Sequence, residues 1–184
     1  MLFHWGIAAL LIANIVLGLY FADLPPDAWK GELAQWHKSI GLTVLVLSIL
    51  RLVWRLTHSV PPLPEDLPWH LRMAARLSHY LFYFLVVAIP LTGWIMVSAS
   101  ASGRPTVFFH LFNWPHISVL ADLPRQQKVG MHDTLVSVHV VLAWTAIVLI
   151  PLHVAAALYH QFIRRDELLL RMLPYRRMRA ETMR

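Results

Sequence analysis

The chain has 184 residues, of which 58% are hydrophobic and only 14% are charged, and it contains no cysteine. A soluble domain of this length would need a far larger polar surface, and a chain without cysteine forms no disulfide, thiolate metal site or cysteine nucleophile. The net charge of +6 does not indicate a nucleic-acid partner, because the basic residues follow the pattern of a membrane topology.

Four apolar stretches predict membrane-crossing helices. A hydrocarbon core of about 30 Å needs roughly 20 helical residues. The whole chain is therefore expected to form one domain, an all-α integral membrane four-helix bundle, with spans at about residues 2–21, 38–56, 74–98 and 134–163. The first stretch has no basic segment before it and no clean small-residue cleavage site, so we expect a retained span and not a signal peptide.

The three connections differ in character. Residues 22–36 form a short, acidic-leaning connection, and residues 57–73 form a proline-rich one. The longest connection covers about residues 99–130 and contains the aromatic segment VFFHLFNWPHISVL. Since aromatic side chains favour the membrane interface, we expect this segment to form a short interfacial helix over the mouth of the bundle.

The basic residues predict the orientation of the chain in the membrane. Eleven of the sixteen lysines and arginines flank the second connection or lie in the C-terminal tail. By the positive-inside rule, both termini and the second connection are cytoplasmic. We expect the basic tail to contact anionic lipid headgroups. The five remaining basic residues lie on the outer side: Lys30, Lys38, Arg104, Arg125 and Lys128.

Two histidines lie inside the fourth apolar stretch. His139 and His153 are fourteen residues apart, with no charged residue between them. At 100° per residue they share one helix face, and they are separated by roughly 21 Å along the axis. Each therefore lies near one end of the hydrocarbon region. An ionisable group inside a span predicts a functional site with a partner, so this spacing predicts two stacked sites.

Haem fits these sites better than the alternatives. Zinc usually takes four ligands, and a proton relay usually includes a buried acid, but these spans contain no acidic or cysteine ligand. Haem needs only axial ligands, and histidine is a common one. Matching depths across the bundle pairs His4 with His153 at the cytoplasmic end and His37 with His139 at the outer end.

Other histidines offer alternatives. His132 and His160 lie seven residues beyond the central pair, near the interfaces, where a hydrogen-bonding role is favoured over ligation. His79 begins the third span and is an alternative to His4 as a ligand, although we favour a role at a quinone or a haem propionate. Solvated positions in connections are expected for His58, His70, His110 and His116.

Small residues and prolines lie near these histidines. Gly6 and Gly41 would permit close approach of a flat macrocycle, and ordinary helix packing explains them equally well. Pro90 and Pro151 lie inside spans, where proline tends to kink a helix. Pro151 precedes His153 by two residues, which fits a helix shaped around a bulky group.

The chain resembles the bacterial cytochrome b561 family of small four-helix, two-haem membrane proteins, over nearly its whole length. The resemblance is carried by HW at His4, WHKSIGLTVLVLSILRLVWRL from Trp36, LSHYLFYFLVVAIPLTGWIM from Leu77, LHVAAALYHQF from Leu152 and LLLRMLP from Leu168. The family pattern of haem ligands falls on His4, His37, His139 and His153. It also occurs in cytochrome b subunits of membrane-bound hydrogenases and formate dehydrogenases. Family members usually have several residues before the first ligand, whereas only three precede His4 here.

The resemblance implies transmembrane electron transfer to ubiquinone through two b-type haems in the bacterial inner membrane. One branch of the family resembles a superoxide oxidase, which takes electrons from periplasmic superoxide. A basic field at the outer side would attract that anion, and its candidate catalytic residues are Lys38, Arg125 and Lys128. The candidate quinone residues lie at the cytoplasmic side: His79, Arg76 and His160.

Two other functions remain open at this point. The protein could be a cytochrome subunit that relays electrons to quinone from a partner dehydrogenase or a periplasmic redox donor. It could also be a membrane scaffold without haem. Reduction of the purified protein by superoxide distinguishes the first alternative, and a b-type haem spectrum excludes the second.

Overall fold

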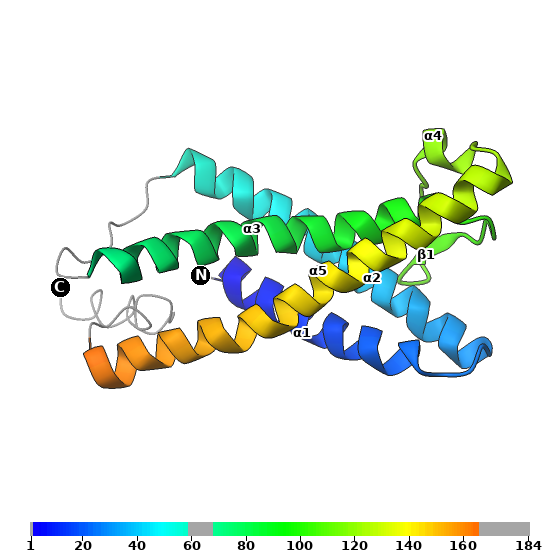
Figure 1. Cartoon of the computed structure of the whole chain (residues 1–184). Coiled ribbons are helices and arrows are strands. Elements are labelled where there is room, and N and C mark those ends of the chain that lie inside the picture. Colours follow the sequence, from blue (N-terminus) through cyan, green and yellow to red (C-terminus); the bar gives the residue numbers. More distant parts are fainter. Residues whose placement is uncertain (1, 59–67, 166–184) are drawn as a thin grey trace.

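Four long helices make up most of the chain. The computed structural model describes residues 2–58 and 68–165. Each of the four helices is long and apolar enough to cross a membrane, which confirms the predicted four-helix membrane bundle (Figure 1). The helices are α1 (Leu2–Ala22), α2 (Ala28–Thr57), α3 (Trp69–Ser98) and α5 (Arg125–Tyr159), the last continued by the π-helical turn η1 (His160–Arg164).

Three helices extend beyond the predicted spans. α2 begins at Ala28 and not near residue 38, and α5 begins at Arg125 and not near residue 134. The side chain of Asp27 caps α2 by accepting a hydrogen bond from the backbone amide of Lys30 (2.7 Å). Hydropathy marks only the apolar part of a helix, whereas backbone hydrogen bonding continues into the polar turns outside it. The predicted spans are therefore the central portions of longer helices.

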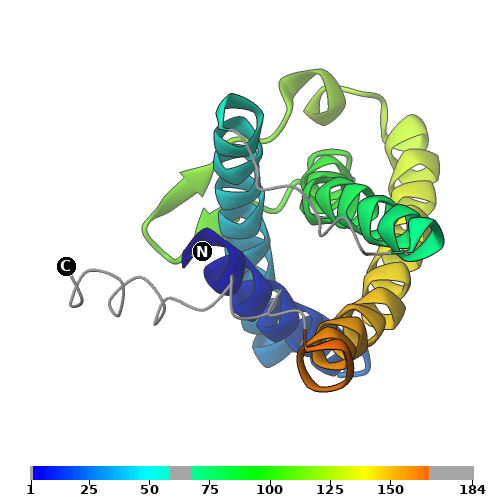
Figure 2. The same cartoon turned by 90° about the vertical axis from the view of Figure 1, so that its left-hand side faces the viewer.

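The helices are arranged around a small apolar core. α1 packs against α2, α2 against α3, and α3 against α5, and the view along the bundle shows the four helices surrounding a common centre (Figure 2). Leu85, Ile89 and Ala146 are buried there, at the contact between α3 and α5. Many large apolar side chains on the helices are exposed, among them Trp144 and Val148. Outward-facing apolar side chains are expected where the surroundings are lipid.

The connection between α3 and α5 forms a β-hairpin. Strands β1 (Thr106–Phe108) and β2 (Phe112–Trp114) pair antiparallel, and the single helical turn α4 (Ser118–Ala121) follows. The predicted interfacial helix is therefore wrong for most of its length. Side chains of α2 explain the difference, because they supply hydrogen bonds that a strand needs and a helix would not use.

Ser39 and Gln35 of α2 hold the hairpin in place. The fully buried hydroxyl of Ser39 shares its one proton between the carbonyls of Gln35 (2.9 Å) and Val107 (3.3 Å), and it accepts from the amide of Phe109 (2.9 Å). The side chain of Gln35 donates to the Pro105 carbonyl (3.0 Å) and accepts from the Val107 amide (3.2 Å). The hairpin is thus fixed over the end of α2 that carries His37.

His110 is exposed, as expected for a solvated position, and it also bonds to α2. Its Nε2 lies 2.7 Å from Oε1 of Glu32, which also accepts a hydrogen bond from the indole of Trp36 (2.8 Å). His110 and Phe109 both have positive φ angles, 59° and 45°, a conformation that is uncommon outside glycine. The contact with Glu32 helps to hold this tight turn.

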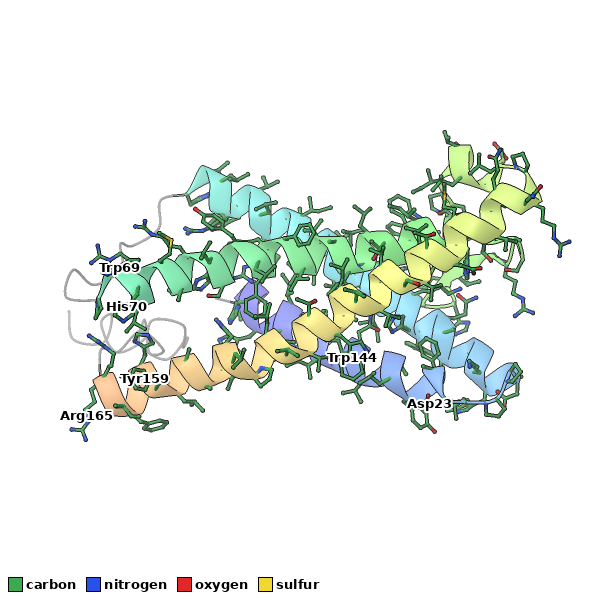
Figure 3. All side chains as sticks on the ribbon, viewed as in Figure 1. Asp23, Trp69, His70, Trp144, Tyr159 and Arg165 are labelled. Atoms are coloured by element: carbon green, nitrogen blue, oxygen red, sulfur yellow. The ribbon has the colours of Figure 1, made fainter. Side chains whose placement is uncertain are left out.

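The two ends of the bundle differ in charge. The hairpin end contains the hairpin and the α1–α2 turn, and the basic end contains the start of α3 and the end of α5. Figure 3 shows Asp23 at the hairpin end and Trp69, His70 and Arg165 at the basic end. All acidic residues within the described ranges lie at the hairpin end: Asp23, Asp27, Glu32, Asp122 and Asp133. The predicted proline-rich second connection, most of the basic tail and the LLLRMLP motif lie largely or wholly outside the described residues.

Candidate functional site

At the hairpin end, His37 of α2 and His139 of α5 face each other. Their ring centres are 6.2 Å apart and their ring planes are inclined by 76°. Both side chains are partly buried. The structure thus brings together the two histidines that were paired by depth at this end.

A backbone carbonyl holds each of these rings. Nδ1 of His37 lies 3.1 Å from the carbonyl oxygen of Asn14 in α1, and Nδ1 of His139 lies 3.0 Å from that of Ile89 in α3. With a carbonyl as partner, Nδ1 carries the proton and donates it, so that Nε2 keeps its lone pair. Histidines that bind a metal commonly have their second nitrogen anchored in this way.

Glycines give the two rings access to these carbonyls. A Cβ atom at Gly18 would lie 2.9 Å from Cε1 of His37, and one at Gly93 would lie 3.3 Å from Cε1 of His139. Gly18 follows Asn14 by four residues, and Gly93 follows Ile89 by four. Each imidazole therefore lies in a notch one helical turn long, between a glycine and the carbonyl of the residue four before it.

A cavity that is partly open to the surroundings adjoins the two rings. The side-chain oxygen of Asn14 is buried at this cavity and has no hydrogen-bond partner. Ligand sites are typically mostly apolar with a few polar groups. The lining residues include Leu11, Asn14, His37, Lys38, Gly41, Leu42, Ile89, Pro90, Gly93, Trp94, Thr106 and His139.

The geometry at the hairpin end fits a haem held between two imidazoles. A haem at this end would need one imidazole nitrogen from each of two rings that lie close together. The observed separation is 6.2 Å. The anchored Nδ1 atoms, the free Nε2 atoms and the cavity all suit this role. His37 and His139 are thus the residues that would hold a haem at this end.

At the basic end, three histidines from three helices form a second cluster. The rings of His79 in α3 and His153 in α5 are 5.9 Å apart, with planes inclined by 88°. Phe82 lies edge-on to His153, at 5.0 Å between ring centres. His4 of α1 is close enough to His79 and His153 for their charges to interact.

Both candidates for the second ligand at the basic end therefore lie near His153. Nδ1 of His79 lies 2.5 Å from the Ala75 carbonyl one turn earlier, but the His79 side chain is exposed. The side chain of His4 is partly buried.

The residues predicted to attract superoxide have different surroundings. Lys38 is partly buried and lines the cavity beside His37. Nζ of Lys128 donates to the carbonyl of Ala121 at the end of α4. Arg125 is exposed at the first residue of α5. Of these three residues, Lys38 alone lines the cavity.

The residues predicted for quinone binding lie at the basic end. Arg76 is exposed on α3, one turn before His79. His160 begins η1, partly buried, with its ring 5.9 Å from that of Tyr159. The structure therefore brings His79 close to His153, while Arg76 and His160 lie further along their helices.

His116 is a site residue that was expected from the sequence to be solvated. It is partly buried, and its Nε2 lies 3.5 Å from Oγ1 of Thr106, which lines the cavity. Burial, and then the positive charges of Lys38 and Lys128, lower the pKa of His116 below its ordinary value. The sequence around His116, including the ISVL segment that follows it, did not indicate this position. The hairpin, which the sequence did not predict, places His116 there.

Asn14, Gly18 and Gly93 were also missed. An asparagine inside an apolar span indicates a functional position, so Asn14 could have been identified from the first apolar stretch. The glycines carried no such signal, because sequence does not tell which glycine faces a histidine. Of the two glycines that were considered, a Cβ added at Gly6 would meet nothing within 4 Å, and one at Gly41 would lie 3.4 Å from the Asn14 amide nitrogen.

Comparison with known proteins shows the family of the chain. Residues 1–175 match the family model described as prokaryotic cytochrome b561. The chain is 35% identical to cytochrome b561 homolog 2 of Escherichia coli over 93% of this chain and 87% of that protein. It is 31% identical to cytochrome b562 of Cereibacter sphaeroides, over 92% and 89%, and 27% identical to a probable superoxide oxidase of Yersinia pestis, over 95% and 93%. The chain therefore belongs to the prokaryotic cytochrome b561 family, whose members are haem-binding electron-transfer proteins that cross the bacterial inner membrane several times.

Proposed function

We propose that the protein binds two b-type haems and transfers electrons from superoxide to ubiquinone. His37 and His139 hold the outer haem, at the hairpin end, and His4 and His153 hold the inner haem, at the basic end. The observation that carries the proposal is the His37–His139 pair, with its 6.2 Å separation and two anchored Nδ1 atoms. The haems, when bound, supply one-electron transfer between the two ends of the bundle.

The proposed reaction balances with two superoxide ions for each quinone. Each superoxide loses one electron and becomes molecular oxygen. Two electrons and two protons convert one ubiquinone to ubiquinol. The protein's own residues need only attract the anion at one end and supply protons at the other, because no covalent bond to a side chain forms.

Basic residues near the outer haem position support superoxide as the donor. Lys38 lines the cavity beside His37, and it is close enough to Arg104 and His116 for their charges to interact. Converging positive charges raise the local concentration of a small anion. The hairpin fixed by Ser39 covers this position, which favours a small donor over a bulky one.

At the basic end, quinone reduction requires proton donors. His79, Arg76 and His160 are the proposed quinone residues, as the sequence indicated. The His79 side chain is exposed and adjoins His153. An imidazole in this position can pass a proton to a quinone oxygen next to the inner haem.

A second candidate function is electron relay from a docked protein partner. The hairpin presents exposed apolar side chains at the same end, with Leu111 76% and Phe112 50% exposed. Exposed apolar groups beside a redox site suit a protein contact. In this case the donor protein would replace superoxide, and the haem pairs and the quinone site would be unchanged.

Rapid mixing of the purified protein with superoxide separates the two functions. We expect superoxide to reduce the haem of the wild-type protein during the experiment. Lys38→Gln is expected to lower the rate of this reduction about tenfold or more, because the positive charge at the cavity is lost. Lys30→Gln is the matched control, since Nζ of Lys30 bonds to the carbonyls of Ala22 and Leu24 at the α1–α2 turn. No reduction by superoxide, together with reduction by a co-purifying protein, would favour the relay.

A further inference from the structure

Arg51 is a charged residue inside the apolar part of α2, near the basic end. Its side chain is partly buried, and Cζ of its guanidinium lies 5.7 Å from the centre of the Tyr83 ring in α3. It is also close enough to His4 in α1 for their charges to interact. Arg51 therefore approaches the histidine cluster at the basic end from α2, the long helix that contributes no histidine to that cluster.

Within the described residues, no acidic side chain lies at that end of the bundle, since all five are at the hairpin end. A guanidinium inside a membrane span is costly unless it has a partner. The Tyr83 ring offers a cation–π contact, which does not neutralise the charge. An anion from outside the protein's own described side chains would satisfy it.

We propose that Arg51 binds a propionate carboxylate of the inner haem. The inference rests on the proposed function, because it requires a haem at the basic end. Arginine matches the two oxygens of a carboxylate with two parallel hydrogen bonds. The contact with Tyr83 restricts the guanidinium, and the charge of Arg51 acts on His4, a proposed axial ligand.

A lipid phosphate is the competing anion, and the position of Arg51 argues against it. Arg55, one turn closer to the end of α2, is exposed, whereas Arg51 is partly buried among α1 and α3. A headgroup would meet Arg55 first. Arg55→Gln is accordingly a matched control, with the same loss of charge from the same helix.

The test uses the haem-loaded protein and potentiometric titration of each haem. Arg51→Gln is expected to shift the inner haem to a more negative reduction potential, because a nearby cation stabilises the added electron, and to leave the outer haem unchanged. Arg55→Gln is expected to leave both unchanged. Equal potentials in wild type and Arg51→Gln would overturn the proposal. So would a shift that occurs only in bilayers containing anionic lipid and not in neutral detergent, because that result assigns the site to a lipid phosphate.

Redox-difference infrared spectra of protein carrying haem with ¹³C-labelled propionates test the contact itself. The labelled carboxylate band is expected to differ between wild type and Arg51→Lys, which keeps the charge but loses the two-pronged contact. An identical band in Arg51→Lys would overturn the proposal even if Arg51→Gln loses its haem. If wild type lacks a second haem, the proposed function fails first. If it has two haems and neither variant responds, only the role of Arg51 fails.

Discussion

The imidazoles of His37 and His139 lie opposite each other, with their ring centres 6.2 Å apart. Each ring is anchored by a backbone carbonyl of another helix, which carries neither histidine. α1 anchors the histidine of α2, and α3 anchors the histidine of α5. In both cases a glycine four residues after the carbonyl makes room for the ring. All four long helices therefore contribute to the placement of this one histidine pair.

Gly18→Ala is expected to weaken haem binding at the hairpin end. The new Cβ would lie 2.9 Å from Cε1 of His37, so the ring must move and its bond to the Asn14 carbonyl is strained. Overpacking of this kind costs about 1–3 kcal/mol. The measurement is haem content per chain together with the melting temperature. Gly6→Ala is the control, because a Cβ there meets nothing within 4 Å. Equal haem content in both variants would contradict the claim that Gly18 makes room for the His37 ring.

Ser39→Ala is expected to loosen the hairpin. The buried hydroxyl accepts from the Phe109 amide and donates to the Val107 carbonyl, and its removal leaves these groups without that partner. The expected loss of stability is about 1–3 kcal/mol. Hydrogen exchange should become faster at residues 106–114. Ser102→Ala removes an exposed hydroxyl from the same connection, and comparable exchange in the two variants would show that Ser39 does not anchor the hairpin.

His116→Gln is expected to reduce the loss of stability in acid. Because burial and the charges of Lys38 and Lys128 lower the pKa of His116 in the fold, the unfolded chain binds the proton more readily. The resulting stability is present above the ordinary pKa of about 6.5 and is lost as the pH falls below it. The measurement compares melting temperatures at pH 7.5 and pH 5.5. The decrease should be smaller in His116→Gln than in wild type, and an equal decrease would contradict the assignment.

The four helices were predictable because long apolar runs leave few alternatives in a bilayer. The pairing of His37 with His139 was predictable for a related reason, since depth along each helix follows from residue number. Topology thus narrows the possible partners of each histidine to those at the same level of the membrane.

The hairpin and the glycine notches were not predictable, because they depend on contacts between distant segments. The aromatic segment has no helix-breaking residue at its turn, and its strands form on hydrogen bonds from Gln35 and Ser39, about 70 residues earlier. Gly18 has its role only because α1 meets His37 on that face. From the sequence, Arg51 served only as one of the basic residues that predict the orientation in the membrane. A binding role is indicated only by its neighbours in the structure, Tyr83 and His4.

The inner ligand pair depends on the choice between His4 and His79, both near His153. We expect His4→Ala to lose the inner haem and His79→Ala to retain both haems with slower quinone reduction. The measurement is the haem content and the reduced-minus-oxidised spectrum of each variant. Loss of the inner haem in His79→Ala, with His4→Ala unaffected, would exchange the two roles.

The haem content of His37→Ala and His139→Ala tests the central claim most directly. Each variant is expected to retain one haem per chain, with the spectrum of the inner haem alone, because each replacement removes one of the two axial ligands of the outer haem. Two haems per chain with the wild-type spectrum in either variant would contradict the assignment of the outer site.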